Sequence, residues 1–493
     1  MHRLAATPGG WDSRSEGVIF IAQTPAPIVF LSAADTDIAA LSRALVGLPD
    51  DFSDVRSVNL LQLQQQLTID TYVEDVLSHA QLIILRLLGG RAYWSYGLEV
   101  LRETVTATGA ALAVLPGEDK PDLDLMSHST LPLSAVNQLW RYFTEGGIEN
   151  VRNALLYASN LVLSTEYQIL APQSVPKIGL YSCLGDCSKD RTEDVTNWKV
   201  LSNKKDKKEQ ILKTSSVEQK AWARVGILFY RAHYLSGNTK IIDAIADALV
   251  RCQLAPVPIY VSSLKALEVQ QALVEVCQPE QSSQSPRDSG IELLINTTSF
   301  AISSLDQSGT GGSLWQQLDV PVLQAICSGS PRSQWQAHPQ GLTPRDIAMN
   351  VALPEVDGRI VTRAVAFKAS APLSLKADGR DKKDLQTDVV VYEPEADRVE
   401  FVAQLAANWV RLGRSPVSER RVALILANYP NRDGRMANGV GLDTPASCLN
   451  VLRALKEAGY TVSELPESGD ALMARLADGV TNAPEGYGLR SVL

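Results

Sequence analysis

The stretch RVGILFYRAHYLSGNTKIIDAIADALVRCQLAPVPIYVSS, residues 224–263, decides the class of fold that this chain adopts. Its apolar run Val225–Phe229 is typical of a buried strand. A polar loop, a helix and a second apolar strand follow. Strands that alternate with helical patterns indicate βαβ units, which pair their strands in parallel.

The same alternation fills the first part of the chain. The apolar stretch at 18–33 predicts two short buried strands, the second of them at Ile28–Leu31, and a helix follows at Thr36–Leu45. Further strand and helix patterns lead to residues 132–170, which read as helical and close a first domain. Gln23 and two prolines interrupt 18–33, and no other stretch approaches a membrane span, so we expect no membrane partner.

We therefore predict an α/β protein made of consecutive doubly wound parallel-sheet domains of the flavodoxin or Rossmann type, the last of them incomplete. The expected domains are 1–172, 173–395 with a charged insertion near 183–220, and 396–493. The third domain offers about two strands, at 422–426 and 461–464, whereas sheets usually have about four to six. This shortage predicts that the chain is the N-terminal part of a longer protein.

Composition narrows the classes of function. The 493 residues carry a formal net charge of -9 with a pI of about 5.3, and no basic patch stands out, so we expect no nucleic-acid partner. Six cysteines are scattered along the chain. This usage favours a reducing, cytoplasmic location over a disulfide framework.

An enlarged loop between the predicted strand at 422–426 and the helix after it is a candidate binding site. It holds about fifteen residues, where loops of this kind usually take roughly 2–6, and its position at a strand's carboxyl end favours ligand binding. The candidate substrate-binding residues are Asn428, Asn431, Arg432, Asp433, Asn438 and Asp443. Thr444 is the expected N-cap of the helix, with Pro445 at its first position. The alternative is a long surface turn before a well-capped helix.

A second loop repeats this arrangement after the strand 225–229. Arg231 and His233 lie there and are candidates for substrate binding or acid/base chemistry. The alternative for His233 is a hydrogen-bonding residue without a catalytic role. Glu355 and Asp357 form another candidate acidic pair, but a turn before a strand is the favoured interpretation of this segment.

Other motifs argue against a cofactor bound by this chain. The Gly-rich stretch 303–315 lacks the lysine of a phosphate-binding P-loop, and no P-loop occurs elsewhere, so any ATP is expected to be hydrolysed by a partner. Cys183 and Cys187 have no second pair nearby, so we predict no metal site. No catalytic residue is assigned.

Several stretches together resemble a known family. NYPNRDGRMANGVGLDTPAS (428–447), GGRAYWSYGLE (89–99), FYRAHYLSGNT (229–239) and ALPEVDGRI (352–360) are similar to signature stretches of the large subunit of aerobic cobaltochelatases, the CobN type, which is related to the magnesium chelatase H subunit. The resemblance extends in order from Met1 to about Val480. The charged region near 183–220 departs from it.

The resemblance implies a role in cobalamin biosynthesis. Such subunits bind a tetrapyrrole, hydrogenobyrinic acid a,c-diamide or a relative, and receive Co²⁺ as a substrate, while AAA+ ATPase subunits drive the insertion. It also implies that the catalytic residues lie C-terminal to this stretch, so the chain alone is expected to be inactive. The alternatives are a magnesium chelatase H-type subunit and a non-catalytic tetrapyrrole-binding or sensor module.

Overall fold

The computed structural model describes residues 18–182, 222–278, 290–303, 313–371, 384–427 and 436–478. Several sequence predictions fall outside these residues. They concern the charged insertion, the cysteine pair and part of the enlarged loop: 183–220, Cys183, Cys187, Asn428, Asn431, Arg432 and Asp433.

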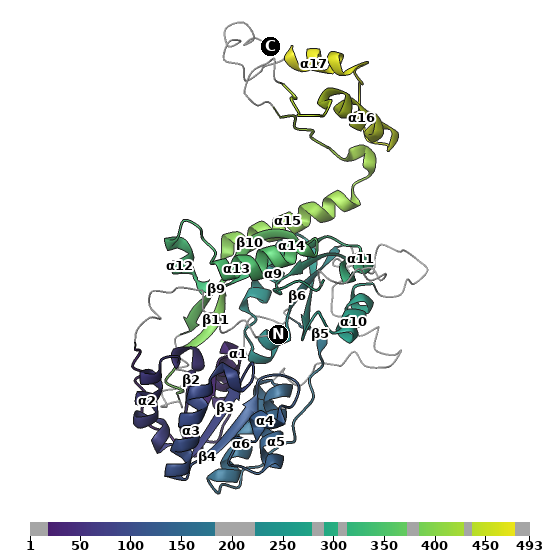
Figure 1. Cartoon of the computed structure of the whole chain (residues 1–493). Coiled ribbons are helices and arrows are strands. Elements are labelled where there is room, and N and C mark those ends of the chain that lie inside the picture. The colour runs from purple at the N-terminus through teal and green to yellow at the C-terminus, as the bar shows by residue number, and fades with distance from the viewer. Residues whose placement is uncertain are drawn as a thin grey trace, which may run out of the picture. The chain divides into compact units, whose positions relative to one another are not determined.

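The first sheet consists of four parallel strands in the order β2-β1-β3-β4 (Figure 1). The strands are β1 (Ile28–Ser32), β2 (Val55–Asn59), β3 (Leu82–Leu87) and β4 (Ala111–Pro116). β1 and β3 are buried along their whole length, which explains why both are almost continuously apolar. The predicted strand at Ile28–Leu31 is confirmed. The strand expected earlier in 18–33 is wrong, because residues 18–22 form no strand and pair with no described strand.

Helices cover both faces of this sheet. α1 (Asp35–Leu45), α5 (Leu133–Glu145) and α6 (Ile148–Val162) pack on one face, and α2 (Gln66–Asp75) and α3 (Ser95–Thr108) on the other. The helical stretch predicted at 132–170 is confirmed over α5 and α6, with a break at Gly146 and Gly147, whose positive φ angles of 69° and 89° a helix does not allow. It is wrong for residues 163–170, which are not helical. Short helices complete the domain: η1 (Leu60–Gln62), η2 (Leu77–His79), η3 (Arg91–Tyr93) and α4 (Leu123–Met126).

The second sheet has seven strands in the order β11-β10-β9-β8-β6-β7-β5. They are β5 (Ile178–Leu180), β6 (Ala223–Tyr230), β7 (Leu254–Val261), β8 (Ile291–Asn296), β9 (Val322–Pro331), β10 (Ile360–Ala371) and β11 (Val389–Pro394). The five inner strands are parallel and only the two edge strands run antiparallel. Among its parallel strands, each sheet places the first beside the third: β1 beside β3, and β6 beside β8. This is the flavodoxin-like order of a doubly wound fold. The predicted fold class is confirmed.

The crossovers of the second sheet are mostly helical. They contain α8 (Arg231–Ser236), α9 (Lys240–Arg251), α10 (Leu267–Cys277), α11 (Leu314–Leu318), α12 (Arg332–Ala337), α13 (Pro344–Ile347), the π-helix η7 (Ala348–Ala352) and α14 (Leu353–Val356). No described helix has both the length and the apolar character that crossing a membrane requires.

The second sheet also contributes to the first domain's core. Leu385, Val389 and Val391, in and just before β11, are buried in one cluster with α1, α5 and α6. The amide of Ser57 in β2 donates to the carbonyl of Leu385 at 3.3 Å. Lys368 of β10 forms an ion pair of 2.6 Å with Asp35 at the start of α1. The two sheets are therefore joined by backbone, apolar and charged contacts.

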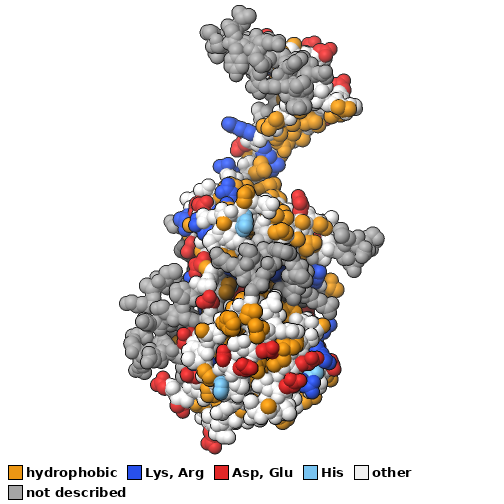
Figure 2. Space-filling model, turned by 60° about the vertical axis from the view of Figure 1, so that its left-hand side comes forward, with side chains coloured by type: hydrophobic (Ala, Val, Ile, Leu, Met, Phe, Trp, Pro, Cys, Tyr) orange, Lys and Arg blue, Asp and Glu red, His pale blue; other side chains and the backbone are white. Residues whose placement is uncertain are grey.

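Residues 408–493 form a separate compact unit, and residues 1–407 the other. α15 (Ala396–Arg414) spans the junction, and η8 (Val417–Glu419), α16 (Thr444–Glu457) and α17 (Gly469–Ala477) follow. The strands predicted at 422–426 and 461–464 are wrong, because neither segment forms a strand or has a ladder partner among the described residues. Hydrophobic side chains are consequently exposed on this unit (Figure 2), and Ile425 is 93% exposed.

Candidate functional site

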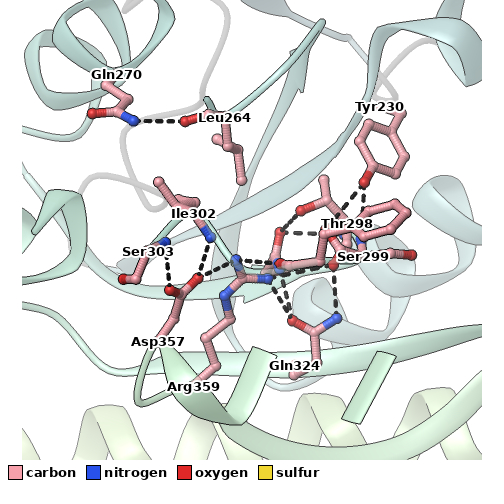
Figure 3. A network of polar contacts seen from close by, with 12 residues as sticks. Tyr230, Leu264, Gln270, Thr298, Ser299, Ile302, Ser303, Gln324, Asp357 and Arg359 are labelled. Atoms are coloured by element: carbon pink, nitrogen blue, oxygen red, sulfur yellow. Dashed lines mark hydrogen bonds and ion pairs between the residues drawn. The ribbon is translucent and has the colours of Figure 1, made fainter. Parts of the chain in front are cut away.

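The loop after β8, residues 297–303, lies where ligands bind in doubly wound folds. β8 pairs with β6 and with β9, and the strand order reverses between β6 and β8. Sites in such sheets form outside the carboxyl ends of the strands at this reversal. A buried polar network surrounds the loop (Figure 3).

The centre of this network is an ion pair between Arg359 and Asp357. The guanidinium Nη2 lies 2.7 Å from Asp357 Oδ2, and both side chains are 0% exposed. Arg359 also donates to the carbonyl of Phe300 at 2.9 Å and to Gln324 Oε1 at 3.2 Å. The ring of Trp315 lies 4.8 Å from the guanidinium carbon. These contacts satisfy the two terminal nitrogens of the guanidinium, as a buried charge pair requires, whereas the buried Nε of Arg359 has no acceptor among the described residues.

Asp357 is held in its charged form. Burial by itself raises the pKa of this carboxyl, but the amides of Ile302 and Ser303, together with the Arg359 charge, outweigh burial and lower the pKa. Burial lowers the pKa of Arg359, and the Asp357 charge opposes this effect. Asp357 therefore serves as an acceptor for the loop amides, in the turn before β10, whereas Glu355 is exposed. The turn interpretation of this segment is the one that the contacts support.

The loop is also held in an unusual backbone conformation. Phe300 has a φ angle of 68°, which costs a residue other than glycine about 1–3 kcal/mol. Its amide donates to the carbonyl of Met349 in the π-helix at 2.9 Å, and the hydroxyl of Ser299 donates to Asn350 of the same helix at 2.6 Å. The hydroxyl of Tyr230, at the end of β6, donates to the Ser299 carbonyl at 3.1 Å. The loop is thus fixed from three elements.

Arg231 contacts the backbone that joins the two sheets. Its guanidinium donates to the carbonyls of Pro176, Val175 and Glu145 at 2.8–3.0 Å, and burial lowers its pKa. It lies on α8, not in the predicted loop, because a short helix begins directly after β6. These contacts give Arg231 a structural role, and its binding role stays a prediction.

His233 also lies on α8, which packs between α1 of the first domain and strands β6 and β7 of the second sheet. Its ring meets the ring of Tyr392 in β11 edge to face, with centroids 5.4 Å apart. α8 also contacts α1 of the first domain. The side chain of Arg43 in α1 lies against Gly237, the residue after α8, so closely that a β-carbon at position 237 would overlap it. The predicted role of His233 in acid/base chemistry is not tested by this packing.

Two candidate residues of the enlarged loop are described. Asn438 and Asp443 are both exposed. The Asp443 carboxylate accepts a hydrogen bond of 3.0 Å from the amide of Ala446, so Asp443 is the N-cap of α16. The expected N-cap at Thr444 is wrong by one residue, and Pro445 occupies the second helical position, because the carboxylate of Asp443 reaches the free amide first.

The described residues contain no group of three or more His, Cys, Asp or Glu side chains placed to hold a metal ion. Sequence analysis missed the central residue of the site. Arg359 stands in the quoted stretch at 352–360, but only its partner Asp357 was singled out. An arginine directly before an apolar strand was the available signal, because a charge there must find a partner once the strand is buried.

These features define a doubly wound α/β protein with a rigid polar loop at the reversal point of its larger sheet. The family model described as CobN/Magnesium Chelatase matches residues 140–492. This match covers most of the chain, and the chain belongs to the CobN/magnesium chelatase family.

Individual relatives agree with this assignment. The aerobic cobaltochelatase subunit CobN of Pseudomonas aeruginosa is 39% identical over 99% of this chain and 36% of its own length. The protein of the same name from Sinorhizobium sp is 40% identical over 98% of this chain and 35% of its own. The magnesium chelatase H subunit of Rhodobacter capsulatus is 27% identical over 50% of this chain and 20% of its own.

A solved structure is similar as well. The catalytic subunit of cobaltochelatase from Mycobacterium tuberculosis superimposes with a TM-score of 0.60 at 26% identity, over 92% of this chain and 33% of that one. This chain therefore spans about a third of the length of the cobaltochelatase relatives that it matches.

Proposed function

We propose that this chain supplies a tetrapyrrole-binding portion of the large subunit of an ATP-dependent cobaltochelatase, which inserts Co²⁺ into hydrogenobyrinic acid a,c-diamide in cobalamin biosynthesis. The observation that carries the proposal is the extent of the match. Identity to two cobaltochelatase subunits is 39–40% over nearly the whole chain, whereas the magnesium chelatase relative named above is 27% identical over half of it.

The described residues suit a binding and positioning role. The Arg359–Asp357 pair fixes the loop at 297–303 before any ligand arrives, and pre-organised loops lose little conformational entropy on binding. Amide and guanidinium groups of the enlarged loop would donate to the carboxylates and carboxamides around a corrinoid rim. The ATPase partners are expected to be AAA+ subunits, and this chain itself holds no P-loop.

A chelation assay tests the proposal. The full-length subunit that contains this chain, with its ATPase partners and ATP, is expected to insert Co²⁺ into hydrogenobyrinic acid a,c-diamide. Residues 1–493 alone are expected to insert no metal and to hydrolyse no ATP. Insertion of Mg²⁺ into protoporphyrin instead would favour the magnesium chelatase alternative. Tetrapyrrole binding without any insertion by the full-length subunit would favour the sensor alternative.

Substitutions in the enlarged loop test the predicted substrate contacts. Arg432→Ala and Asp433→Ala, made in the full-length subunit, are expected to weaken tetrapyrrole binding by about 1–3 kcal/mol for each charged hydrogen bond lost. Fluorescence-quench titrations measure this change. Unchanged affinity in both variants would leave the loop without a role in binding.

A further inference from the structure

The unit at 408–493 contains a large open groove beside a small core. The groove has a volume of about 1130 Å³. Among the described residues of this unit, the buried apolar side chains are Val410, Ala437, Leu449 and Leu472. Folded interiors are close-packed and contain few voids larger than a water molecule. A groove of this size next to so few buried side chains indicates a surface that another segment covers.

Two helices each turn one face toward the groove. On α16 the lining residues are Cys448, Leu452 and Leu455, at intervals of four and three residues. On α17 they are Leu472 and Leu476, four residues apart. Residues at these intervals lie on a single face of a helix. In layered α/β folds, apolar helix faces of this kind pack against a sheet.

The segment 422–426 lines the same groove with alternate residues. Val422, Leu424 and Leu426 line it, whereas Ala423 and Ile425 do not. A spacing of two residues is that of a β-strand, whose side chains alternate between its faces. Val422 and Leu424 are nevertheless 53% and 41% exposed. The segment therefore has the side-chain pattern of a strand without the burial of one.

The backbone of this segment is also open to pairing. Within the described part of the chain, the amides and carbonyls of 422–426 form no hydrogen bond. The second segment, 460–463, also lines the groove, and the Thr461 hydroxyl donates to the carbonyl of Ser418 at 2.7 Å. An apolar run with unpaired backbone groups is a template to which a further strand can add.

The relatives of this chain indicate which segment can fill the groove. The match to the two CobN subunits covers 36% and 35% of their lengths, so most of each subunit lies outside it. The family model extends to residue 492, so the unit at 408–493 is part of the family's sequence. In a subunit of the relatives' length, the remaining chain is covalently linked to this unit, and its effective concentration at the groove is high.

We propose that this groove is the docking surface for an apolar β-strand from the remainder of the large subunit. The strand pairs with the backbone of 422–426 and covers the apolar faces of α16 and α17, so that the unit gains a sheet. The inference rests on the family to which the chain belongs. It is independent of the metal and the tetrapyrrole named in the proposed function.

Cys448 is a natural probe of this surface, because its thiol lines the groove and is partly exposed. Maleimide labelling, read by mass spectrometry of peptides, compares the 493-residue chain with the full-length subunit at equal concentration. Labelling of Cys448 is expected to be slower by about tenfold or more in the full-length subunit, because a covered thiol reacts only when the structure opens. Cys252, a partly exposed cysteine in the other unit, is the control and is expected to react equally fast in both.

Two adjacent residues of α16 provide a matched pair of variants. Leu452 lines the groove and Val451 does not. In the full-length subunit, Leu452→Asp is expected to restore the labelling rate of Cys448 to that of the 493-residue chain, and Val451→Asp is expected to leave it slow. In the 493-residue chain, both variants are expected to react as fast as the unaltered protein. Thermal unfolding verifies that each variant keeps its fold.

The outcomes keep this inference apart from the proposed function. Equally fast labelling of Cys448 in the full-length subunit would contradict the docked strand. Slow labelling already in the 493-residue chain would contradict it too, since this chain would then cover its own groove, or a second copy would if the rate falls with rising protein concentration. Restored labelling in both full-length variants would also contradict it, because the effect would not depend on the groove. Protection of Cys448 in a subunit that inserts no metal would leave the docking surface standing and the proposed function wrong.

Discussion

Two stretches of this chain have almost the same pattern and opposite structures. RVGILFY at 224–230 lies in β6, whereas RVALILA at 421–427 forms no strand and is mostly exposed. In the sequence, a polar stretch and then a helical pattern follow each apolar run. In the structure, α8 begins directly after β6. β6 pairs with β7 and β8 along most of its length, whereas the second stretch has no ladder partner among the described residues. The difference shows that an apolar run alone does not form a strand, because its backbone must also hydrogen-bond to strands from distant parts of the chain.

The largest expected effect concerns the buried polar network around Arg359, which includes Tyr230 at the end of β6. Among the described residues, the stretch 421–427 has no such network beside it. Arg359→Met removes the partner of the buried Asp357 and is expected to lower the free energy of unfolding by about 3–5 kcal/mol, because an unpaired buried charge remains. Urea denaturation measures it. Arg421→Met, at the exposed start of the second stretch, is the matched control and is expected to change stability by less than about 0.5 kcal/mol. Equal effects would contradict the comparison.

Two apolar positions that correspond in the two stretches test the comparison more closely. Leu228 in β6 is 0% exposed, and the corresponding Ile425 is 93% exposed. Leu228→Ala is expected to cost about 2–5 kcal/mol, because it removes transfer energy and leaves a cavity. Ile425→Ala is expected to cost less than about 0.5 kcal/mol. A large cost at Ile425, measured in the same urea titrations, would mean that the second stretch is packed in solution.

The helices that follow the two stretches allow a smaller test. Asp443→Ala removes the observed cap of α16 and is expected to destabilise that helix by about 1 kcal/mol. Thr444→Ala, at the position that the sequence favoured, is expected to cost less than about 0.5 kcal/mol. Hydrogen exchange of the amides in the first turn of α16 reports both changes. Faster exchange in the Thr444 variant alone would restore the sequence-based assignment.

The Arg359–Asp357 ion pair also predicts that the free energy of unfolding depends on pH through the Asp357 carboxyl. The pKa of Asp357 is lower in the folded chain than in the unfolded one, so its charged form contributes stability above the unfolded pKa of about 4. This contribution is lost as the pH falls through the folded value. The stability difference between the unaltered chain and Asp357→Asn is therefore expected to be constant above about pH 5 and to shrink below about pH 4. A difference that stays constant down to pH 2 would contradict this.

The sequence predicted the folds of both sheets because their strands carry strong local signals. β1 and β6 are apolar runs that neighbouring strands and helices bury completely or nearly so. The same rule failed at 422–426 and 461–464, where the local pattern is present and the neighbours are not. Residues 18–22 failed for a related reason, since Ile21 alone of that run packs against the core.

The candidate site was less predictable than the fold. Arg231 and His233 were selected for their place after a strand, and the structure adds a short helix that packs both against the first domain. Arg359 and Gln324 meet Thr298 and Phe300 only through pairing of β8, β9 and β10. Such contacts between residues far apart in sequence leave no periodic signal in a single chain.

The position of Leu385 has a consequence for synthesis on the ribosome. Leu385, Val389 and Val391 fill the core that α1, α5 and α6 begin. Leu385 follows the end of α6 at Val162 by about 220 residues, so at roughly 5–20 residues per second the ribosome delivers it about 10–40 s later. During that interval the emerging first domain exposes the apolar surface that these residues later cover. Nascent chains that end between Val162 and Leu385 are therefore expected to depend on chaperones more than shorter or longer ones do.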